Sequence, residues 1–408
     1  MISRRSFLLS AARFGPLAGA ALSFPGLLQL PASEPDALFP AGQADDLIRS
    51  APRARFWATT AGGSRCLDCH TASEKLPAGK HDHKRVILKC LLCARECAIP
   101  EGRRGQCRVR MNVRGELRSL VYGRPVTFQV DPIEKKPFYH FLPGSQAFSL
   151  ATAGCPLRCK FCQNWQISQS SPEDFDTAFV PPDQAVDTAI SRKAPVIAFT
   201  YNEPTVFTEY LTDIARAGKK KAMRHVMISC GFVNPLPLAE ICGLLDAIKI
   251  DLKGFDEEFY RKVCQAELQP VLRSIKQIAR SGVHLEIVNL VVPTLNDSEK
   301  MMRALVDWVF GELGPDVPLH FTRFHPDYQM LNLPPTPIAT LERARDMARS
   351  RGIRYAFLGN VPGHPGNHTY CPGCGKVVVR RNGLSMEELN IKGGKCLFCG
   401  RAVAGVWS

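Results

Sequence analysis

Three cysteines lie close together in the segment GCPLRCKFCQNW, which runs from residue 154 to residue 165. Cys155, Cys159 and Cys162 are spaced four and three residues apart, and no fourth cysteine follows closely. Three thiolates in one loop can ligate three irons of a [4Fe–4S] cube, which leaves the fourth iron open to a substrate. A structural zinc loop is the alternative, but such sites use four protein ligands. The spacing therefore predicts an iron–sulfur cluster with one open position.

Two sets of four cysteines flank this segment, with the short spacings of metal ligands. They are Cys90, Cys93, Cys97 and Cys107 in the first set and Cys371, Cys374, Cys396 and Cys399 in the second. The C-x2-C-x3-C-x9-C spacing of the first set suits zinc or a second iron–sulfur cluster equally. In the second set a glycine follows each cysteine pair and lets backbone amides turn toward the sulfurs, as in zinc knuckles and rubredoxin-like ribbons. We expect zinc there, ahead of iron.

A shorter motif, RCLDCH, contains Cys66, Cys69 and His70. CxxCH is the attachment signal of c-type haem, and His81 or His83 can supply a second axial ligand. Haem c is normally attached to unfolded chains outside the cytoplasm, whereas the N-terminus indicates export of a folded chain. We therefore expect an extra pair of metal ligands or free thiols here, ahead of haem.

The N-terminus resembles a twin-arginine export signal. Residues 3–8 read SRRSFL, and a mildly apolar stretch rich in Ala, Gly and Leu follows. This start predicts a prokaryotic protein of the periplasm or one anchored at the membrane, with the cytoplasm as the alternative. No other apolar run reaches about 18 residues, so no membrane span is expected in the body of the chain.

Length and charge limit the remaining classes. A chain of 408 residues with 45% hydrophobic content can form a main domain of roughly 200 to 250 residues plus smaller modules. The formal charge of +14 falls to roughly +9 if the cysteine sets bind their metals as thiolates. That balance favours an acidic or phosphate-bearing partner. No run of five or more Lys or Arg occurs, so nucleic acid is not an expected partner.

Seven β-rich runs alternate with amphipathic helical segments, which predicts an α/β fold with a parallel sheet. The expected strands are residues 147–152, 195–200, 225–229, 247–252, 284–292, 319–324 and 354–359. The expected helices include residues 235–245, 268–282, 298–314 and 335–352. In the last of these, Thr336 is expected to be the N-cap and Pro337 to lie in the first turn. Six or seven such units predict a partial, TIM-like (β/α) barrel, with chemistry at the C-terminal ends of the strands.

The motifs and the strand pattern together divide the chain into five parts. They are a signal (1–32), a linker with CxxCH (33–85), a Cys-rich N-terminal module (86–144), the barrel (145–361) and a zinc-ribbon-like module (362–408). Cys230, Cys242 and Cys264 belong to no set and are expected to be ordinary barrel cysteines.

The CxxxCxxC segment, with aromatic Phe161 before its last cysteine, resembles the signature of radical S-adenosylmethionine (SAM) enzymes. The resemblance implies that Cys155, Cys159 and Cys162 are the catalytic cluster ligands. It also implies that the open iron is chelated by the amino and carboxylate groups of SAM. One-electron reduction by an external donor then breaks a carbon–sulfur bond and yields a 5′-deoxyadenosyl radical, which abstracts hydrogen from a substrate.

Further positions match that family. Asn202, Glu203 and Pro204 stand where the superfamily carries its Gly-Gly-Glu-type motif, which implies contact with the methionyl ammonium; Tyr201 and Asn202 depart from the glycine form. Asp251 and Lys253 in DLK are similar to residues of pyruvate formate-lyase activating enzymes that reach polar groups of SAM.

Later strand ends match less closely. SCG at 229–231 stands where relatives often have Thr-Asn-Gly, and VVPTLND lies near the implied adenine with Thr294 in place of a usual glycine. His325, after the sixth expected strand, is a further candidate for cofactor binding, with a structural role as the alternative.

Longer stretches are similar to the AmmeMemoRadiSam-system radical SAM enzymes, from about residue 89 to the C-terminus. They are QVDPIEKKPFYHFLPGS, CQNWQISQ, DLKGFDEEFYRKVC, RFHPDY, NVPGH and NHTYCPGCG. By analogy with activating enzymes, the resemblance implies that a partner protein is the substrate. Two alternatives are a multi-centre iron–sulfur electron carrier without SAM chemistry and a basic zinc-ribbon protein that binds nucleic acid.

Overall fold

The computed structural model describes residues 41–59 and 87–408, which belong to one compact unit. The twin-arginine-like segment, the Cys66–Cys69–His70 motif and the two candidate axial histidines lie outside the described residues. In the described ranges, every helix is either too short or too polar to cross a bilayer.

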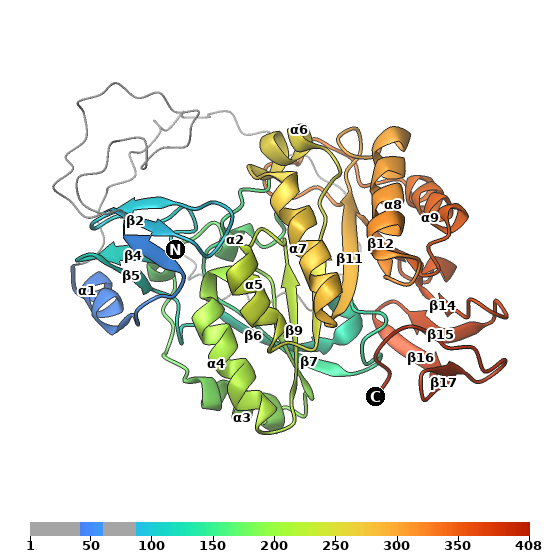
Figure 1. Ribbon diagram of the computed structural model, residues 1–408, viewed down its shortest axis with the longest axis horizontal. Helices are drawn as coiled ribbons and strands as arrows, with labels where there is room; N and C mark the ends of the chain where they lie inside the picture. Colours follow the sequence, from blue (N-terminus) through green and yellow to red (C-terminus); the bar gives the residue numbers. More distant parts are fainter. Residues whose placement is uncertain (1–40, 60–86) are drawn as a thin grey trace, which may run out of the picture. The chain divides into compact units, whose positions relative to one another are not determined.

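An eight-stranded sheet forms the centre of the fold (Figure 1). Its strands have the linear order β13-β12-β11-β10-β9-β8-β7-β6. Its strands are β6 (Thr127–Pro132), β7 (Gln146–Ala151), β8 (Val196–Phe199), β9 (Arg224–Ser229), β10 (Ala247–Asp251), β11 (His284–Val291), β12 (Leu319–Arg323) and β13 (Ala356–Gly359). The seven strands from β7 to β13 pair in parallel, and β6 pairs antiparallel to β7. All seven predicted strands are present, and they lie side by side in the order in which they follow one another along the chain. The sequence did not predict β6, which has only one fully buried residue and ends in proline.

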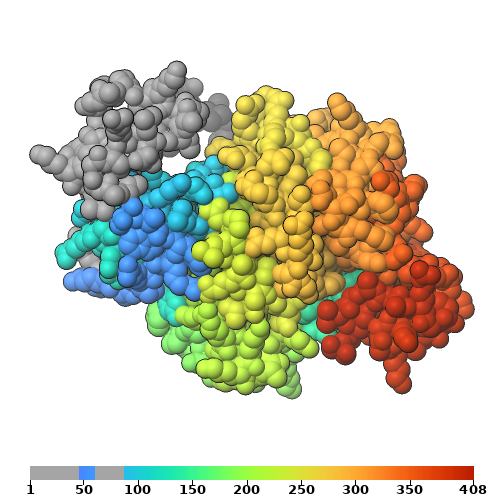
Figure 2. All heavy atoms as spheres, viewed as in Figure 1, coloured from blue at the N-terminus to red at the C-terminus, as the bar shows by residue number. Residues whose placement is uncertain are grey.

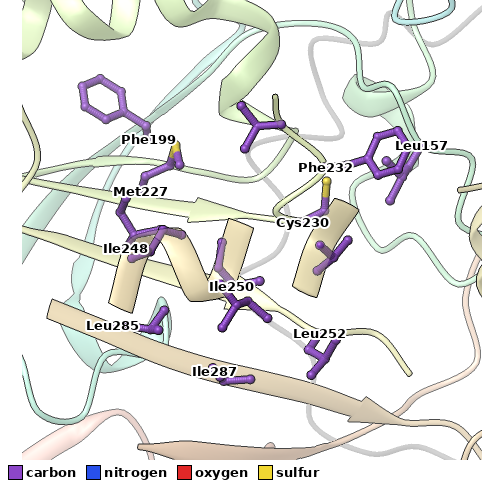
Figure 3. Packing of buried hydrophobic residues seen from close by; sticks show 14 of the residues in the cluster. Leu157, Phe199, Met227, Cys230, Phe232, Ile248, Ile250, Leu252, Leu285 and Ile287 are labelled. Atoms are coloured by element: carbon purple, nitrogen blue, oxygen red, sulfur yellow. The ribbon is translucent and has the colours of Figure 1, made fainter. Parts of the chain in front are cut away.

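Helices follow the strands, and the longer ones cover one face of the sheet. They are α2 (Trp165–Ser168), α3 (Pro182–Ser191), α4 (Thr208–Lys219), α5 (Pro235–Cys242), α6 (Glu257–Phe259), α7 (Leu268–Ser281), α8 (Glu299–Leu313) and α9 (Ile338–Arg351). Short η helices add η3 (Ile133–Lys135), η4 (Pro172–Asp174), η5 (Pro204–Phe207), η6 (Tyr260–Cys264) and η7 (Pro365–Asn367). Alternate strand residues face the helices. Figure 3 shows Phe199, Met227, Ile248 and Ile250, which belong to the largest hydrophobic cluster of the described residues.

The prediction that Thr336 is the N-cap of α9 is wrong. The helix begins at Ile338 after Pro337, and Thr336 makes no capping hydrogen bond. Its hydroxyl donates to the Val291 carbonyl at 2.6 Å and accepts from the Phe324 amide at 2.9 Å. Thr336 therefore ties the ends of β11 and β12 together, a tertiary use that the local sequence pattern does not reveal.

The other face of the sheet is covered by the segment that joins β6 to β7. Ile133, Phe138 and Phe141 pack against small or β-branched residues of β7 to β10, which point away from the helices. The backbone amides of Tyr139 and His140 donate to the buried carboxylate of Glu286 at 2.7–3.0 Å. The segment therefore covers this face of the sheet and is held to β11 near the start of that strand.

The described residues before β6 are called the N-terminal module from here on. They include residues 41–59 of the expected linker, whereas β6 and the segment after it lie in or on the central sheet. They form α1 (Ala41–Ser50), a sheet of β1 (Trp57–Thr59), β2 (Ile87–Cys90) and β3 (Ala98–Pro100), and a hairpin of β4 (Arg110–Val113) and β5 (Glu116–Ser119). The buried Arg110 guanidinium pairs with Glu209 of α4 at 2.5 Å. The Arg55 backbone amide donates to Glu209 and its guanidinium donates to Glu240, so this module is joined to α4 and α5 (Figure 2).

The C-terminal module has a sheet of β14 (Thr369–Tyr370), β15 (Val377–Asn382) and β16 (Ser385–Leu389), and a pair of β17 (Ile391–Lys392) and β18 (Lys395–Cys396). The buried Arg381 donates to the carbonyl of Tyr139 at 2.5 Å and to Asn367 and Thr369. His140 lies where the segment between β6 and β7 meets the C-terminal module, and its Nδ1 atom is 2.6 Å from the Ala404 carbonyl oxygen. Both residues attach this module to the segment that covers the sheet.

Candidate active site

The three cysteines of CxxxCxxC lie in the loop that directly follows β7, here called the Cys155 loop (residues 152–164). Cys159 is buried and Cys155 and Cys162 are half-buried. The Leu157 amide points at the Cys155 sulfur at 3.4 Å, and the Ser168 hydroxyl lies 3.2 Å from the Cys162 sulfur. The loop is therefore at the C-terminal edge of the sheet, where the fold predicts chemistry.

The electrostatic surroundings of the three thiols differ. Burial raises the pKa of Cys155, and the charge of Glu203 raises it further; burial also raises the pKa of Cys162. The hydrogen bond with Cys264 and the charge of Lys253 lower the pKa of Cys159. Thiolates at the two raised positions need a cationic partner, which the irons of a cluster supply. Cys264, expected to be an ordinary barrel cysteine, thus contacts a member of the motif.

Asn202 and Glu203 follow β8 and tie the neighbouring strand ends together. The Asn202 amide nitrogen donates to Thr152, Ala153 and Gly154 of the Cys155 loop at 2.9–3.3 Å. Among the described residues, no donor reaches its buried Oδ1 atom. A buried acceptor without a donor is costly, so this oxygen suits a ligand with N–H groups such as the SAM ammonium.

The Glu203 carboxylate is held by four donors. Oε1 accepts from the Thr205 amide and hydroxyl and from the Ser229 hydroxyl at 2.6–3.1 Å, and Oε2 accepts from the Cys230 amide at 2.7 Å. Pro204 begins the buried η5 turn that places Thr205 under the carboxylate. These bonds fix an anion beside the Cys155 loop, and Oε2 keeps further acceptor capacity.

Asp251 and Lys253 lie at the end of β10. Burial alone would raise the pKa of Asp251, but the charges of Lys249 and Lys253 hold it below its usual range. Lys253 Nζ lies 3.6 Å from Asp251 and 5.6 Å from the centre of the Phe161 ring, a cation–π contact. Burial opposes the charged form of Lys253, yet the charges of Asp251 and Cys159 raise its pKa well above normal. The DLK motif and the Cys155 loop are therefore in contact.

Thr294 and His325 follow β11 and β12. Thr294 is exposed and has a φ of 67°, a left-handed backbone conformation that glycine adopts most easily. Asn296 donates to the carbonyls of Lys253 and Leu290 at 2.7 and 2.8 Å. His325 follows β12 and so lies at the same edge of the sheet. Because it is exposed, it does not belong to the buried residues around the Cys155 loop.

Sequence reasoning missed a second charged group beside this site. The Tyr201 hydroxyl donates to Asp131 at 2.6 Å, and Lys135 and Lys136 each pair with that carboxylate at 2.8 Å. Despite its burial, these donors lower the pKa of Asp131 to about 2, while burial lowers the pKa of Lys136 to about 8. The charged residues of this group are visible in the sequence QVDPIEKKP. Asp131 meets Tyr201 only because β6 pairs with β7.

The two four-cysteine sets differ in geometry. In the C-terminal set, all four sulfurs lie within 4.8 Å of one another, with Cys371–Cys399 at 3.5 Å and Cys374–Cys396 at 3.9 Å. Four thiolates around one zinc ion with bonds of about 2.3 Å stand roughly 3.8 Å apart, so this set fits a single tetrahedral ion. In the N-terminal set, burial and the charges of the other three cysteines raise the pKa of Cys93.

Comparisons with known proteins find similar sequences and a family domain. The Radical SAM superfamily domain matches residues 149–306. An uncharacterised protein of Methanocaldococcus jannaschii is 42% identical over 78% of this chain and 95% of its own length. A pyruvate formate-lyase-activating enzyme of Clostridium pasteurianum is 24% identical over 38% of this chain and 65% of its own length.

Among solved structures, a domain of a pyruvate formate-lyase-activating enzyme from Bacteroides vulgatus is 16% identical. The match covers 40% of this chain and 98% of that chain, with a TM-score of 0.36. These matches show that this chain contains a Radical SAM superfamily domain and belongs to the same family as the relative from Methanocaldococcus jannaschii.

Proposed function

We propose that this protein is a radical SAM enzyme of the AmmeMemoRadiSam type that cleaves SAM and abstracts hydrogen from a substrate. One observation carries the proposal: the Cys155 loop, the Asn202–Glu203 pair and the Asp251–Lys253 pair are in contact at one edge of the sheet. These elements lie far apart in the sequence, and they supply sulfur ligands, an anion with a free acceptor, and a cation.

In this proposal each group has a defined task. Cys155, Cys159 and Cys162 hold a [4Fe–4S] cluster, which in this superfamily supplies the electron that breaks a carbon–sulfur bond of bound SAM. Asn202 Oδ1 and Glu203 Oε2 accept from the methionyl ammonium, since both have acceptor capacity in a buried setting. Lys253, stacked near Phe161, offers donors to polar groups of SAM.

A protein substrate and an external one-electron donor complete the proposal. The relative from Clostridium pasteurianum is named for its action on another enzyme, pyruvate formate-lyase, which supports a protein substrate here. Asp131, Lys136 and Tyr201 form a hydrogen-bonded charged group beside the site that can bind polar groups of such a substrate. Export through the twin-arginine-like N-terminus and the five-part domain division also belong to the proposal.

Zinc is the ion proposed for the C-terminal module. The sulfur separations of 3.5 and 3.9 Å suit one tetrahedral ion with four thiolate ligands. Backbone amides of Gly373 and Phe398 point at the sulfurs of Cys371 and Cys396 at 3.4 Å, as expected for ligands that carry negative charge.

Electron paramagnetic resonance tests the proposal. We expect reduced, anaerobically reconstituted protein to give a [4Fe–4S]+ signal that shifts with SAM, together with formation of 5′-deoxyadenosine. Cys159→Ala should abolish both results, whereas Cys242→Ala, at the end of α5 and outside the three sets, should retain them. A signal that does not respond to SAM would instead support an electron carrier.

A further inference from the structure

The N-terminal four-cysteine set is formed by a hairpin and the loop that follows it. The Cys90 amide donates to the Cys97 carbonyl at 2.9 Å across β2 and β3, and the Gln106 amide points at the Cys97 sulfur at 3.5 Å. Cys90, Cys93 and Cys107 are each less than 9% exposed. Buried cysteines brought together from a hairpin and a loop form a ligand site that the proposed SAM chemistry does not use.

The four thiols act on one another electrostatically. Burial raises the pKa of Cys93, and the charges of Cys90, Cys107 and Cys97 raise it further. Four thiolates gathered in this way can ligate an iron–sulfur cluster.

The N-terminal four-cysteine set also contacts the Cys155 loop directly. The Cys107 carbonyl lies 2.4 Å from the position that a Cβ atom would take at Gly154, whose φ is 90°. Only glycine permits this approach, because any side chain would collide with the backbone. The residue before the first cluster cysteine is thus packed against a ligand of the second site.

Two arginines connect the sites further. Arg158 of the Cys155 loop donates to the carbonyl of Cys155 at 2.9 Å and to the carbonyl of Gln106. Arg95, between Cys93 and Cys97 in the sequence, donates to the Pro156 carbonyl at 3.2 Å. Their positive charges favour the reduced, more negative form of a cluster at either place.

We propose that Cys90, Cys93, Cys97 and Cys107 hold an iron–sulfur cluster that exchanges electrons with the centre held by the Cys155 loop. One electron from a low-potential one-electron donor enters the N-terminal centre and passes to the Cys155 loop; no bond is made or broken and no proton moves. The inference rests on the proposed function, because the electron is consumed only if SAM is cleaved.

Metal analysis of cysteine variants tests the site. All variants carry Cys66→Ser and Cys69→Ser, so that neither residue supplies a ligand, and all are reconstituted anaerobically with iron and sulfide. Cys93→Ser/Cys97→Ser should lose about two or four irons per chain and their sulfide relative to the parent. It should keep its zinc, and Cys242→Ser serves as the matched control. Loss of zinc instead of iron would overturn the proposal.

A complementary variant keeps the test independent of folding in the N-terminal module. Cys155→Ala/Cys159→Ala/Cys162→Ala should still bind that same amount of iron and sulfide; a chain that binds none would contradict the inference. If this triple variant retains SAM cleavage, the proposed function fails while the second cluster stands. The two failures are therefore distinguishable.

Magnetic resonance tests the electronic contact. When both centres are reduced, the spectrum of the parent should differ from the sum of the spectra of the two variants, because neighbouring spins interact. A spectrum equal to that sum would overturn the proposed electron exchange.

Discussion

At the scale of single residues, Asn202 is the link between two motifs. Its amide nitrogen donates to three acceptors of the Cys155 loop, and its amide oxygen is the buried acceptor that SAM can use. Asn202 therefore positions the cluster ligands as well as the cofactor.

Asn202→Ala should lower the free energy of unfolding by about 1–3 kcal/mol, because buried acceptors lose their donor. It should also weaken SAM binding, measured by titration of the reconstituted protein. Asn234→Ala is a matched control, since its amide donates to the Leu91 carbonyl at 3.0 Å outside the site. That control should lose stability but not SAM affinity. SAM binding of unchanged strength in Asn202→Ala would contradict the assignment.

At the scale of elements, the residues after two strands of the sheet have left-handed backbone conformations, although neither residue is glycine. Tyr201 after β8 and Thr294 after β11 have φ values of 71° and 67°, in the left-handed region that favours glycine. Tyr201 gains a hydrogen bond to Asp131 in return, whereas the exposed Thr294 side chain has no comparable contact among the described residues.

Thr294→Gly should raise the free energy of unfolding by about 1 kcal/mol, because a β-branched residue is strained at positive φ. Thr294→Asn should give a smaller gain, since asparagine tolerates this region. Urea denaturation measures both values. Equal stability of all three proteins would show that the loop relaxes the strain in another way.

At the scale of the whole molecule, His140 joins the segment that covers the sheet to the C-terminal module. Its ring lies 4.4 Å from the Tyr355 ring and 5.0 Å from the Trp407 ring, centre to centre. Burial lowers the pKa of His140 to about 3, so the folded protein keeps this ring neutral.

The free energy of unfolding should therefore fall as the pH falls below 6.5. His140 binds a proton in the unfolded chain at that pH but stays neutral in the folded protein. One such group gives a slope of about 1.4 kcal/mol per pH unit between the two pKa values. His225, with a pKa lowered by burial to about 4, adds to the slope in the same direction. Urea unfolding between about pH 5 and pH 7 should show a shallower slope for His140→Gln. An unchanged slope would contradict the role of His140.

The sequence by itself determined the local features of this protein. Ligand spacing placed Cys155, Cys159 and Cys162 in one loop, and the alternation of strand and helix patterns predicted all seven parallel strands, because both depend on residues close in the chain. Only the tertiary structure decided which distant segments meet. It paired β6 with β7, so that Asp131 reaches Tyr201, and it brought the Cys107 carbonyl against Gly154. Such contacts depend on strand register and on packing between modules, which no local pattern specifies.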